Sequence, residues 1–359
     1  MPPVSLLQPV LPSLCERLQL ALREASHPMA DAVLALMPDK GLAHDHVRLV
    51  DTGVLARIPK QSQMGLAAKD NLAYQRACFE RASASGHTPQ WHGWLAPSAH
   101  LPRGALLVEE VMGRSARLPQ DLGAIARAMA SWHRMDLPAE AARAPLLNAD
   151  DPLRALLQEI EIQAAHLPAA ALGAGVMQVI EAQLAALRAL CERPERPARR
   201  LIAFDGHPGN FLVRADGSAV LVDLEKCRYS YPALDLAHAT LYTSTTWDAD
   251  SHAVLTTDEV IGFYRHWSEA VGGAAPEAQA WHVPLRRAMW LWSVTWCAKW
   301  RVLSRQTGAA GADGEDWSAE RSEAALVAHV RERVDHYLSV AVVQQVLDGF
   351  DSLDRELRP

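Results

Sequence analysis

The stretch LIAFDGHPGNFLVRADGSAVLVDLEKCRYSYPALDL, residues 201–236, decides the fold of this chain. It holds two short apolar runs, Phe211-Leu212-Val213 and Ala219-Val220-Leu221-Val222, which are typical of β-strands. The segment between them contains Asp216-Gly217, a dipeptide that strongly favours a tight hairpin turn. The two runs are therefore predicted to form a β-hairpin.

Polar residues lie at both ends of this predicted hairpin. Asp205 and Asn210 bound the turn DGHPGN that precedes the first run, and Asp223 follows the second run. Because a hairpin brings its two ends together, we expect Asp205, Asn210 and Asp223 to converge at one rim. Such a set, with no buried lysine within it, suits phosphoryl transfer. One carboxylate accepts the proton of the attacking hydroxyl, while the amide and the other carboxylate hold Mg²⁺ on nucleotide phosphates.

This spacing resembles the aminoglycoside phosphotransferase and choline kinase-like family, small-molecule relatives of the protein kinases. The family's loop usually reads H-G-D-x-H-P-x-N and is followed by a hairpin and I-D-[WFL]-[DE]. Residues 205–210 and 223–225 fit this pattern, and residues 232–237, PALDLA, match the family's P-x-x-D-L-A segment. Ala203 and Phe204 stand where the family has His and Gly. An ordinary acidic hairpin is the alternative interpretation, because short motifs also match by chance.

The resemblance implies a role for each polar residue of this stretch. Asp205 would be the catalytic base or the group that orients the acceptor hydroxyl. Asn210 and Asp223 would hold Mg²⁺. The supporting residues would be His207, which braces the loop, Glu225, which adds a metal ligand or shapes the acceptor side, and Asp235, which anchors the loop by hydrogen bonds.

A second hairpin is predicted over residues 41–58, where the family places the loop that covers the nucleotide. Such loops are usually glycine-rich, because backbone N–H groups must approach phosphates closely, but only Gly41 precedes the first strand here. A plain hairpin is therefore the alternative. On the second strand Arg57 shares a face with Leu55, and the resemblance favours Arg57 as the residue that binds phosphates. Lys60 falls on the other face and is expected to be a solvated charge.

Residues 70–85 are predicted to form a helix with Asp70 as N-cap and Gly86 as its stop. In the family this helix supplies a Glu that pairs with the basic residue of the strand. Gln75 occupies the matching position, so either the pair is a weaker hydrogen bond or the register differs. Glu80 is the nearest carboxylate and is expected on a solvated face.

The fold implied by the resemblance is α+β: a two-lobe protein-kinase-like fold with a small β-rich N-lobe and a large, mainly helical C-lobe. Residues 1–40 are predicted to be an N-terminal helical extension, since residues 11–36 have helical spacing with a break near Pro28. Residues 41–112 would form the N-lobe, which ends in a hinge where the backbone of Glu110 and Val111 reads adenine. Residues 113–359 would form the C-lobe, with the catalytic loop at 203–225.

Two further features of the C-lobe are open to interpretation. His133 lies in a segment that matches the family's L-A-x-L-H helix, and we expect it to be a hydrogen-bonded structural residue. Trp292, Trp296 and Trp300 recur on one helix face. They predict either an aromatic box for a cationic acceptor or, as we favour, a core helix. Loops are expected at residues 243–250 and 307–317.

Composition narrows the class of protein. Hydrophobic residues make up 49% and charged residues 21% of the 359 residues, which is typical of a globular protein. The net charge of −7 argues against a nucleic-acid-binding protein, since such proteins carry a basic surface. The five cysteines are scattered without a CxxC pair, as in reduced cytosolic proteins. With neither a basic signal-peptide region nor an apolar run of membrane-spanning length, the chain is expected to be cytoplasmic and free of membrane partners.

Taken with the resemblance, these observations predict an ATP-dependent phosphotransferase that uses Mg²⁺ and phosphorylates a hydroxyl group of a small molecule. An aminoglycoside, a choline-like amine, a sugar and an amino-acid derivative all remain open as acceptors. The alternative from another class is a non-catalytic nucleotide-binding or scaffold protein on the same fold. The single glycine of the covering loop, Ala203 and Gln75 favour that alternative, whereas the pair of Asn210 and Asp223 argues against it.

Overall fold

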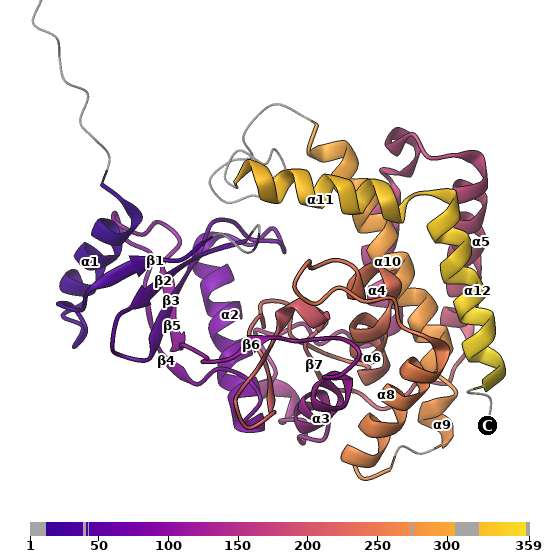
Figure 1. The fold of residues 1–359 in the computed structure, drawn as a ribbon, viewed down its shortest axis with the longest axis horizontal. Coiled ribbons are helices and arrows are strands. Elements are labelled where there is room, and N and C mark those ends of the chain that lie inside the picture. The colour runs from indigo at the N-terminus through magenta and orange to yellow at the C-terminus, as the bar shows by residue number, and fades with distance from the viewer. Residues whose placement is uncertain (1–11, 39–40, 42, 274–275, 306–322, 357–359) are drawn as a thin grey trace, which may run out of the picture.

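The computed structural model describes residues 12–38, 41, 43–273, 276–305 and 323–356. Its N-terminal part is a small lobe built on an antiparallel sheet, and its larger remainder is mostly helical (Figure 1). The two-lobe, protein-kinase-like α+β fold predicted from the sequence is therefore confirmed. The division of the chain at residues 40 and 112 stays a prediction.

The small lobe contains a five-stranded antiparallel sheet whose strands follow the order β1-β2-β3-β5-β4. The strands are β1 (Leu34–Leu36), β2 (His44–Leu49), β3 (Val54–Pro59), β4 (Trp91–Leu95) and β5 (Ala105–Glu109). The hairpin of β2 and β3 is the one expected from the sequence, and its register places Arg57 opposite His46. Since β3 is the central strand of this sheet, the Arg57 side chain projects from the middle of the sheet.

The N-terminal segment differs from the expected helical extension. Helix α1 covers only Leu14–Glu24, capped by Ser13, and it ends before Ser26, which has a positive φ of 49°. Leu34–Leu36 is a strand that pairs with β2 instead of continuing the helical pattern. Gly41 consequently lies in the connection between β1 and β2.

Alternation along the strands gives the sheet two different faces. Val54 and Ala56 of β3 pack with Leu18 and Leu22 of α1 in one apolar cluster. The opposite face of β5, with Leu106 and Val108, packs with helix α2 (Ala68–Ala82) in a second cluster. Since β3 residues alternate in the same way, Leu55 and Arg57 point toward α2 and the large lobe, as the period of two predicted.

Helix α2 begins earlier than expected. Its N-cap is Ala67, which makes no side-chain cap, so Asp70 lies inside the first turn instead of capping it. A carboxylate there still complements the positive end of the helix. The helix continues as a short 3₁₀ turn over Ser83–Ser85, and Gly86 ends it with a left-handed φ of 73°, as the glycine stop predicted.

The large lobe combines helices with three short pairings of strands. Its helices are α3 (Leu122–His133), α4 (Pro152–Ala164), α5 (Ala174–Glu192), α6 (Pro232–Thr240), α7 (Tyr242–Thr245), α8 (Thr257–Ala270), α9 (Pro276–Gln279), α10 (His282–Leu303), α11 (Ala324–Tyr337) and α12 (Val340–Glu356). A second large core surrounds α10 and includes Trp300, while Trp292 and Trp296 are only partly buried against it. Helix α7 overlaps the start of the first expected loop, residues 243–250, and residues 307–317 lie outside the described residues.

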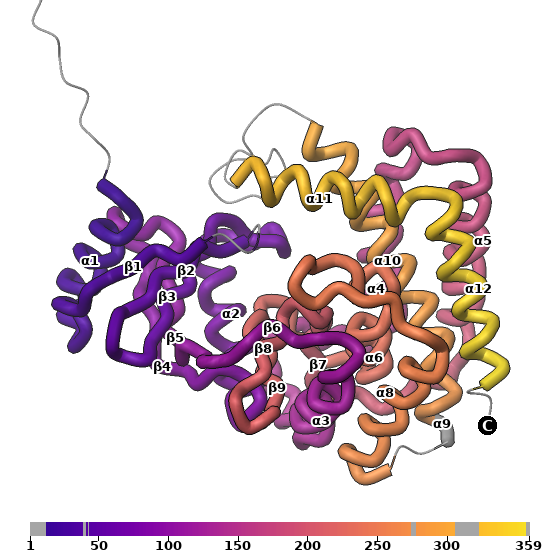
Figure 2. Tube along the Cα trace, viewed as in Figure 1, coloured from indigo at the N-terminus to yellow at the C-terminus, as the bar shows by residue number. Residues whose placement is uncertain are grey.

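The hairpin predicted from residues 201–236 is present. Strands β8 (Phe211–Val213) and β9 (Ala219–Leu221) pair with Phe211 opposite Leu221, and β6 (Arg114–Ser115) adds to the β8 edge. Strands β7 (Arg200–Ile202) and β10 (Arg228–Ser230) form a separate pair. Figure 2 shows β6, β8 and β9 between the small-lobe sheet and the helices of the large lobe. The apolar cluster of α2 and β5 continues into α3 and this hairpin, so the two lobes share one core.

Among the described helices, α5 alone is long and apolar enough to span a membrane by length and composition, whereas no apolar run of that length was expected. Its buried residues recur on one face, which packs against the core around α10. The other face carries charge, and Arg188 forms an ion pair of 2.8 Å with Glu161 of α4. This amphipathic pattern is typical of a helix that covers a protein core.

Removal of one hydroxyl tests how α2 is joined to the large lobe. The buried Tyr74 hydroxyl donates to the Cys227 carbonyl at 2.7 Å and accepts from the Leu147 N–H at 3.3 Å. Tyr74→Phe leaves both backbone groups without this partner, so we expect the free energy of unfolding to fall by about 1–3 kcal/mol in urea titrations. The control is Glu80→Gln, which breaks the exposed Arg76–Glu80 pair of the same helix and is expected to change stability by less than about 0.5 kcal/mol. Equal effects of the two substitutions would contradict the link.

Candidate active site

The site is anchored by one fully buried carboxylate. Asp235, in the first turn of α6, accepts hydrogen bonds from the backbone N–H groups of Ala203 at 2.8 Å and Phe204 at 2.7 Å. His133 Nε2 donates to the same carboxylate at 3.0 Å, and Trp267 Nε1 donates to the other ring nitrogen of His133 at 2.9 Å. His133 is thus a hydrogen-bonded residue of the scaffold. Asp235 fixes the two residues that lead into the Asp205 loop.

Phe204 has an unusual backbone conformation for a residue with a large side chain. Its φ is 63°, in the left-handed region that favours glycine, and this is the position where the family pattern has Gly. Its ring is buried, contacts the Arg228 guanidinium at 3.6 Å and meets the Trp292 ring edge-on at 5.2 Å. We infer that this packing and the Asp235 hydrogen bond together offset the backbone strain.

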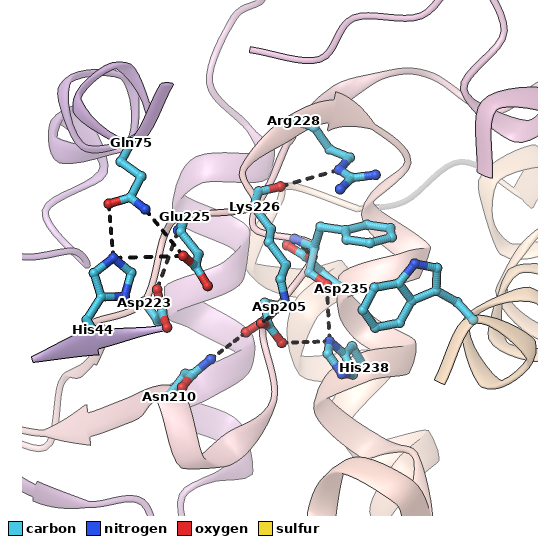
Figure 3. Close-up of polar contacts among 12 residues, drawn as sticks. His44, Gln75, Asp205, Asn210, Asp223, Glu225, Lys226, Arg228, Asp235 and His238 are labelled. Atoms are coloured by element: carbon cyan, nitrogen blue, oxygen red, sulfur yellow. Dashed lines mark hydrogen bonds and ion pairs between the residues drawn. The ribbon is translucent and has the colours of Figure 1, made fainter. Parts of the chain in front are cut away.

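Asp205 follows directly and is presented at the rim of the hairpin. Its backbone carbonyl accepts a hydrogen bond of 2.9 Å from the Asn210 amide nitrogen, and Val222 N–H donates to the Asn210 carbonyl at 2.9 Å. Asp223 comes immediately after Val222. Figure 3 shows the side chains of Asp205, Asn210 and Asp223 gathered at one place. The structure thus brings together the three residues singled out from the sequence.

The expectation that no buried lysine belongs to this set is wrong. The Lys226 ammonium lies 2.7 Å from Asp205 Oδ2, and its side chain is only 10% exposed. His238 Nδ1 lies 3.7 Å from the other oxygen of Asp205. Burial acts against ionisation of Asp205, but the positive charge of Lys226 outweighs it and holds the pKa of this carboxyl well below its usual range. Asp205 is therefore a carboxylate at neutral pH.

Arg57 reaches the second carboxylate of the site. Its guanidinium donates to Asp223 Oδ1 at 2.8 Å and to the Val222 carbonyl at 2.7 Å. Burial opposes ionisation of Asp223, yet Arg57 and then His44 lower its pKa, so Asp223 is also ionised. Arg57 Nε is buried without a hydrogen-bond partner among the described residues. A phosphate oxygen beside it would supply that partner.

Gln75 does not pair with Arg57, so the expected contact between helix and strand is absent from the described residues. The Gln75 amide instead accepts from His44 Nε2 at 3.0 Å and donates to Glu225 Oε2 at 3.3 Å. Glu225 therefore faces β2 and α2, and burial together with the nearby Asp223 raises its pKa to about 8. The raised pKa favours the protonated form of Glu225 when the site holds no metal ion.

The remaining residues named from the sequence have the following positions and contacts. Glu80 pairs with Arg76 on the exposed face of α2, as expected. Lys60 is not a solvated charge, because its side chain is only 5% exposed and lies 3.9 Å from Asp45. At the hinge, Glu110 N–H donates to the Gly53 carbonyl and its carboxylate contacts Arg48 at 2.5 Å. Val111, the next residue, is half-buried.

His207 and Gly209 determine the conformation of the turn that follows Asp205. The His207 carbonyl accepts from Asn210 N–H at 3.0 Å, so its backbone helps to close the turn. Its Nδ1 is buried without a partner among the described residues, and its ring lies 5.9 Å from that of His238. A side chain at Gly209 would collide with Asp248, with a Cβ only 2.7 Å from the Asp248 Cβ, so glycine is required for this close approach.

The donor set fits magnesium. The Asn210 amide nitrogen donates to the Asp205 backbone carbonyl at 2.9 Å, so the amide oxygen of Asn210 is not used in this contact. Carboxylate and amide oxygens are the hard ligands that Mg²⁺ prefers. Within the described part of the chain no three His, Cys, Asp or Glu residues gather as a metal site. A cation held by Asn210 and Asp223 would therefore complete its coordination with phosphate oxygens and water.

The comparisons with known proteins agree with this geometry. The sequence profile of the phosphotransferase enzyme family matches residues 38–270, which is more than half of the chain. The chain belongs to the phosphotransferase enzyme family. No curated protein sequence is significantly similar to it.

Several solved structures share the fold of this phosphotransferase. A choline/ethanolamine kinase family protein from Mesorhizobium loti has a TM-score of 0.58 at 16% identity, with coverage of 95% of this chain and 100% of that one. A spectinomycin phosphotransferase in complex with ADP and spectinomycin has a TM-score of 0.60 at 10% identity, covering 96% of this chain and 100% of that chain. An ethanolamine kinase from Plasmodium vivax has a TM-score of 0.59 at 12% identity, covering 92% and 89%. At these identities the likeness shows the fold alone.

Sequence reasoning missed three residues of this phosphotransferase site: Lys226, His238 and His44. Lys226 follows Asp223 and Glu225 in the motif segment, but its partner is Asp205, 21 residues away in sequence, so no neighbouring residue signals the ion pair. His238 lies one helical turn after Asp235, on the same side of α6. His44 gives no signal in the sequence, because its neighbours in space come from α2 and from the segment after β9.

At most buried positions alanine is a more stable replacement than glycine. The left-handed backbone of Phe204 predicts the reverse order there. Both Phe204→Ala and Phe204→Gly lose the buried ring and are expected to cost about 3–5 kcal/mol in the free energy of unfolding. Glycine also removes the strain of a positive φ, so Phe204→Gly should be the more stable of the two by about 1 kcal/mol. Urea unfolding monitored by tryptophan fluorescence measures the difference.

The matched control is Phe211, which is equally buried but has an ordinary φ of −107°. There Phe211→Ala should be more stable than Phe211→Gly, because glycine weakens a strand. If alanine were the more stable replacement at both positions, Phe204 would not occupy a strained conformation.

Proposed function

We propose that this phosphotransferase moves the γ-phosphoryl group of ATP to a hydroxyl group of a small molecule at the rim of the β8–β9 hairpin. The observation that carries the proposal is the convergence of Asp205, Asn210 and Asp223 there, with Arg57 bound to Asp223. Membership of the family supports the reaction class. ADP bound to the spectinomycin phosphotransferase of the same fold supports a nucleotide as phosphate donor.

In the proposed reaction Asp205 accepts a hydrogen bond from the acceptor hydroxyl and aims its oxygen at the γ-phosphorus. Its low pKa, to which Lys226 contributes most, keeps Asp205 ionised and able to accept this hydrogen bond at neutral pH. Mg²⁺ bound by Asn210 and Asp223 would neutralise charge on the nucleotide phosphates. Arg57 contributes a second positive charge beside Asp223, and the hinge backbone at Glu110 and Val111 holds the adenine. Catalysis of this kind rests mainly on positioning and on charge stabilisation.

The same proposal places the protein in the cytoplasm. All five cysteines lie in the described part of the chain, and none of them forms a disulfide. Four of the five are buried, so reduced thiols are part of the core. Reduced thiols are typical of cytosolic proteins.

Substitution of Asp205 tests the reaction directly. Asp205→Asn keeps the shape of the side chain but removes the negative charge that orients the hydroxyl. We expect Mg²⁺–ATP to bind within a few fold of the wild-type affinity by calorimetry, and phosphoryl transfer from radiolabelled ATP to fall by at least about a hundredfold. Asp216→Asn, in the exposed hairpin turn, is the control and should leave both quantities unchanged. Near-normal turnover of Asp205→Asn would exclude Asp205 as the orienting group.

This experiment needs an acceptor, which a panel of aminoglycosides, amino alcohols, sugars and hydroxylated amino acids would supply. A wild-type protein that binds Mg²⁺–ATP and phosphorylates none of them, and that does not hydrolyse ATP, would favour the non-catalytic nucleotide-binding alternative. The single glycine of the β1–β2 connection would then be consistent with that alternative.

The metal assignment has a separate test. Asp223→Ala removes one of the two proposed ligands, so the gain in ATP affinity that Mg²⁺ provides should largely disappear in calorimetric titrations with and without EDTA. Affinity for metal-free ATP should change much less, because Arg57 remains. A variant whose ATP affinity still rises with Mg²⁺ as in the wild type would show that Asp223 is not a ligand.

A further inference from the structure

The ammonium of Lys226 has a defined place at the reacting end of the site. It lies 2.7 Å from Asp205 Oδ2 and is carried by the segment that begins with Asp223. Lys226 therefore connects the carboxylate that orients the acceptor with the chain segment that would hold the metal. Figure 3 shows Lys226 extending to Asp205 from the side opposite Asn210.

A network of neighbours holds Lys226 in this position. Its ammonium lies 5.6 Å from the centre of the Trp292 ring, a favourable distance for a cation–π contact. Its backbone carbonyl accepts from Arg228 Nε at 3.3 Å. Glu159 binds Arg228 at 2.5 Å and accepts from Trp292 Nε1 at 3.3 Å. The Glu159 carboxylate thus positions both Arg228, which binds the Lys226 backbone, and the Trp292 ring, which lies beneath the Lys226 ammonium.

The charge of Lys226 is retained at neutral pH. Burial disfavours the ammonium, but the negative charge of Asp205 outweighs burial and raises the pKa of Lys226 above its ordinary value. A fixed ammonium in a largely water-excluded place acts on a developing negative charge more strongly than a solvated one. Because the Lys226 ammonium lies so close to Asp205 Oδ2, it also lies near the acceptor hydroxyl oxygen that Asp205 would direct at the γ-phosphorus.

We propose that Lys226 is a catalytic residue that donates a hydrogen bond to the phosphoryl group as it passes from ATP to the acceptor. The acceptor oxygen bonds to the γ-phosphorus, the bond from that phosphorus to the β,γ-bridging oxygen breaks, and ADP leaves with the electron pair. The hydroxyl proton passes to Asp205, while Lys226 keeps its protons and stabilises the oxygens of the group in transit. This inference rests on the proposed function.

A purely structural role for Lys226 is the competing explanation, because an unpaired Asp205 would be costly to bury. The two roles differ in what they predict for a transition-state analogue. A structural lysine is needed for any bound state of the site. A lysine that contacts the transferred group adds affinity for ADP with aluminium fluoride, which resembles the phosphoryl group in transit, but adds little for ADP alone.

The experiment uses the full-length chain carrying Lys226→Met, which keeps the length of the side chain without its charge. We expect Mg²⁺–ADP affinity within a few fold of wild type, and a loss of at least about tenfold in the extra affinity that aluminium fluoride provides. Transfer from radiolabelled ATP to the acceptor, or to water in its absence, should slow by at least about a hundredfold. Lys69→Met, on the exposed start of α2, is the control and should match wild type.

A second pair of variants covers the case in which Lys226→Met does not fold. Asp205→Asn and Asp205→Asn/Lys226→Met both lack the buried carboxylate, so the lysine is no longer needed to neutralise it. The proposal expects the double variant to lose a further part of the aluminium fluoride gain. Equal affinities of these two variants, or near-normal turnover of Lys226→Met, would overturn the role of Lys226.

The wild-type protein separates this inference from the function on which it rests. A wild type that transfers phosphate while Lys226→Met is unaffected overturns the inference alone. A wild type that neither binds Mg²⁺–ATP nor transfers phosphate overturns the proposed function, and the role of Lys226 falls with it.

Discussion

The hydrogen bonds between Asp235 and the backbone of Ala203 and Phe204 are the interaction on which the site depends. A carboxylate without access to water must find donors, and here it takes two of them from consecutive peptide groups. These bonds fix the last two peptide groups before the Asp205 loop. The positive φ of Phe204 turns the chain directly after them. Asp205 then leaves the turn toward the hairpin rim, so a buried residue of α6 determines where the proposed catalytic carboxylate lies.

The positive φ of Phe204 also determines the direction of its side chain. Because Phe204 is inverted relative to a normal strand residue, its ring points into the lobe, between the Arg228 guanidinium and the edge of Trp292. Trp292 in turn lies beneath the Lys226 ammonium. The aromatic ring that the sequence offered as part of a box for a cationic acceptor is thus already in contact with a cation of the protein. A cationic acceptor at that ring would compete with Lys226 for it.

Local patterns predicted much of this structure, and long-range contacts account for what they missed. The β8–β9 hairpin and the face of Arg57 followed from turn residues and periodicity, which depend on neighbours in sequence, and helix α3 followed from the family resemblance. The strand β1 was missed because Leu34–Leu36 is too short for a pattern and is formed only by pairing with β2. Lys226 and Lys60 were misjudged for a similar reason, since a lysine is buried only where a distant chain segment supplies its carboxylate. Family likeness located Asp205, Asn210 and Asp223, but it gave no information on the partners that set their charge.

The amide at Gln75 is best understood from the charges around it. An acid at this position would stand within hydrogen-bond reach of Glu225, which is already crowded by Asp223 and has a pKa raised to about 8. A third carboxyl in the same low-dielectric place would have to be protonated or leave the contact. The neutral amide avoids this conflict, because it accepts from His44 and donates to Glu225 at once. It also leaves the charge of Arg57 to Asp223 and to the phosphates proposed to lie there. The missing acid of α2 is therefore a consequence of where Glu225 lies, and it does not by itself indicate an inactive site.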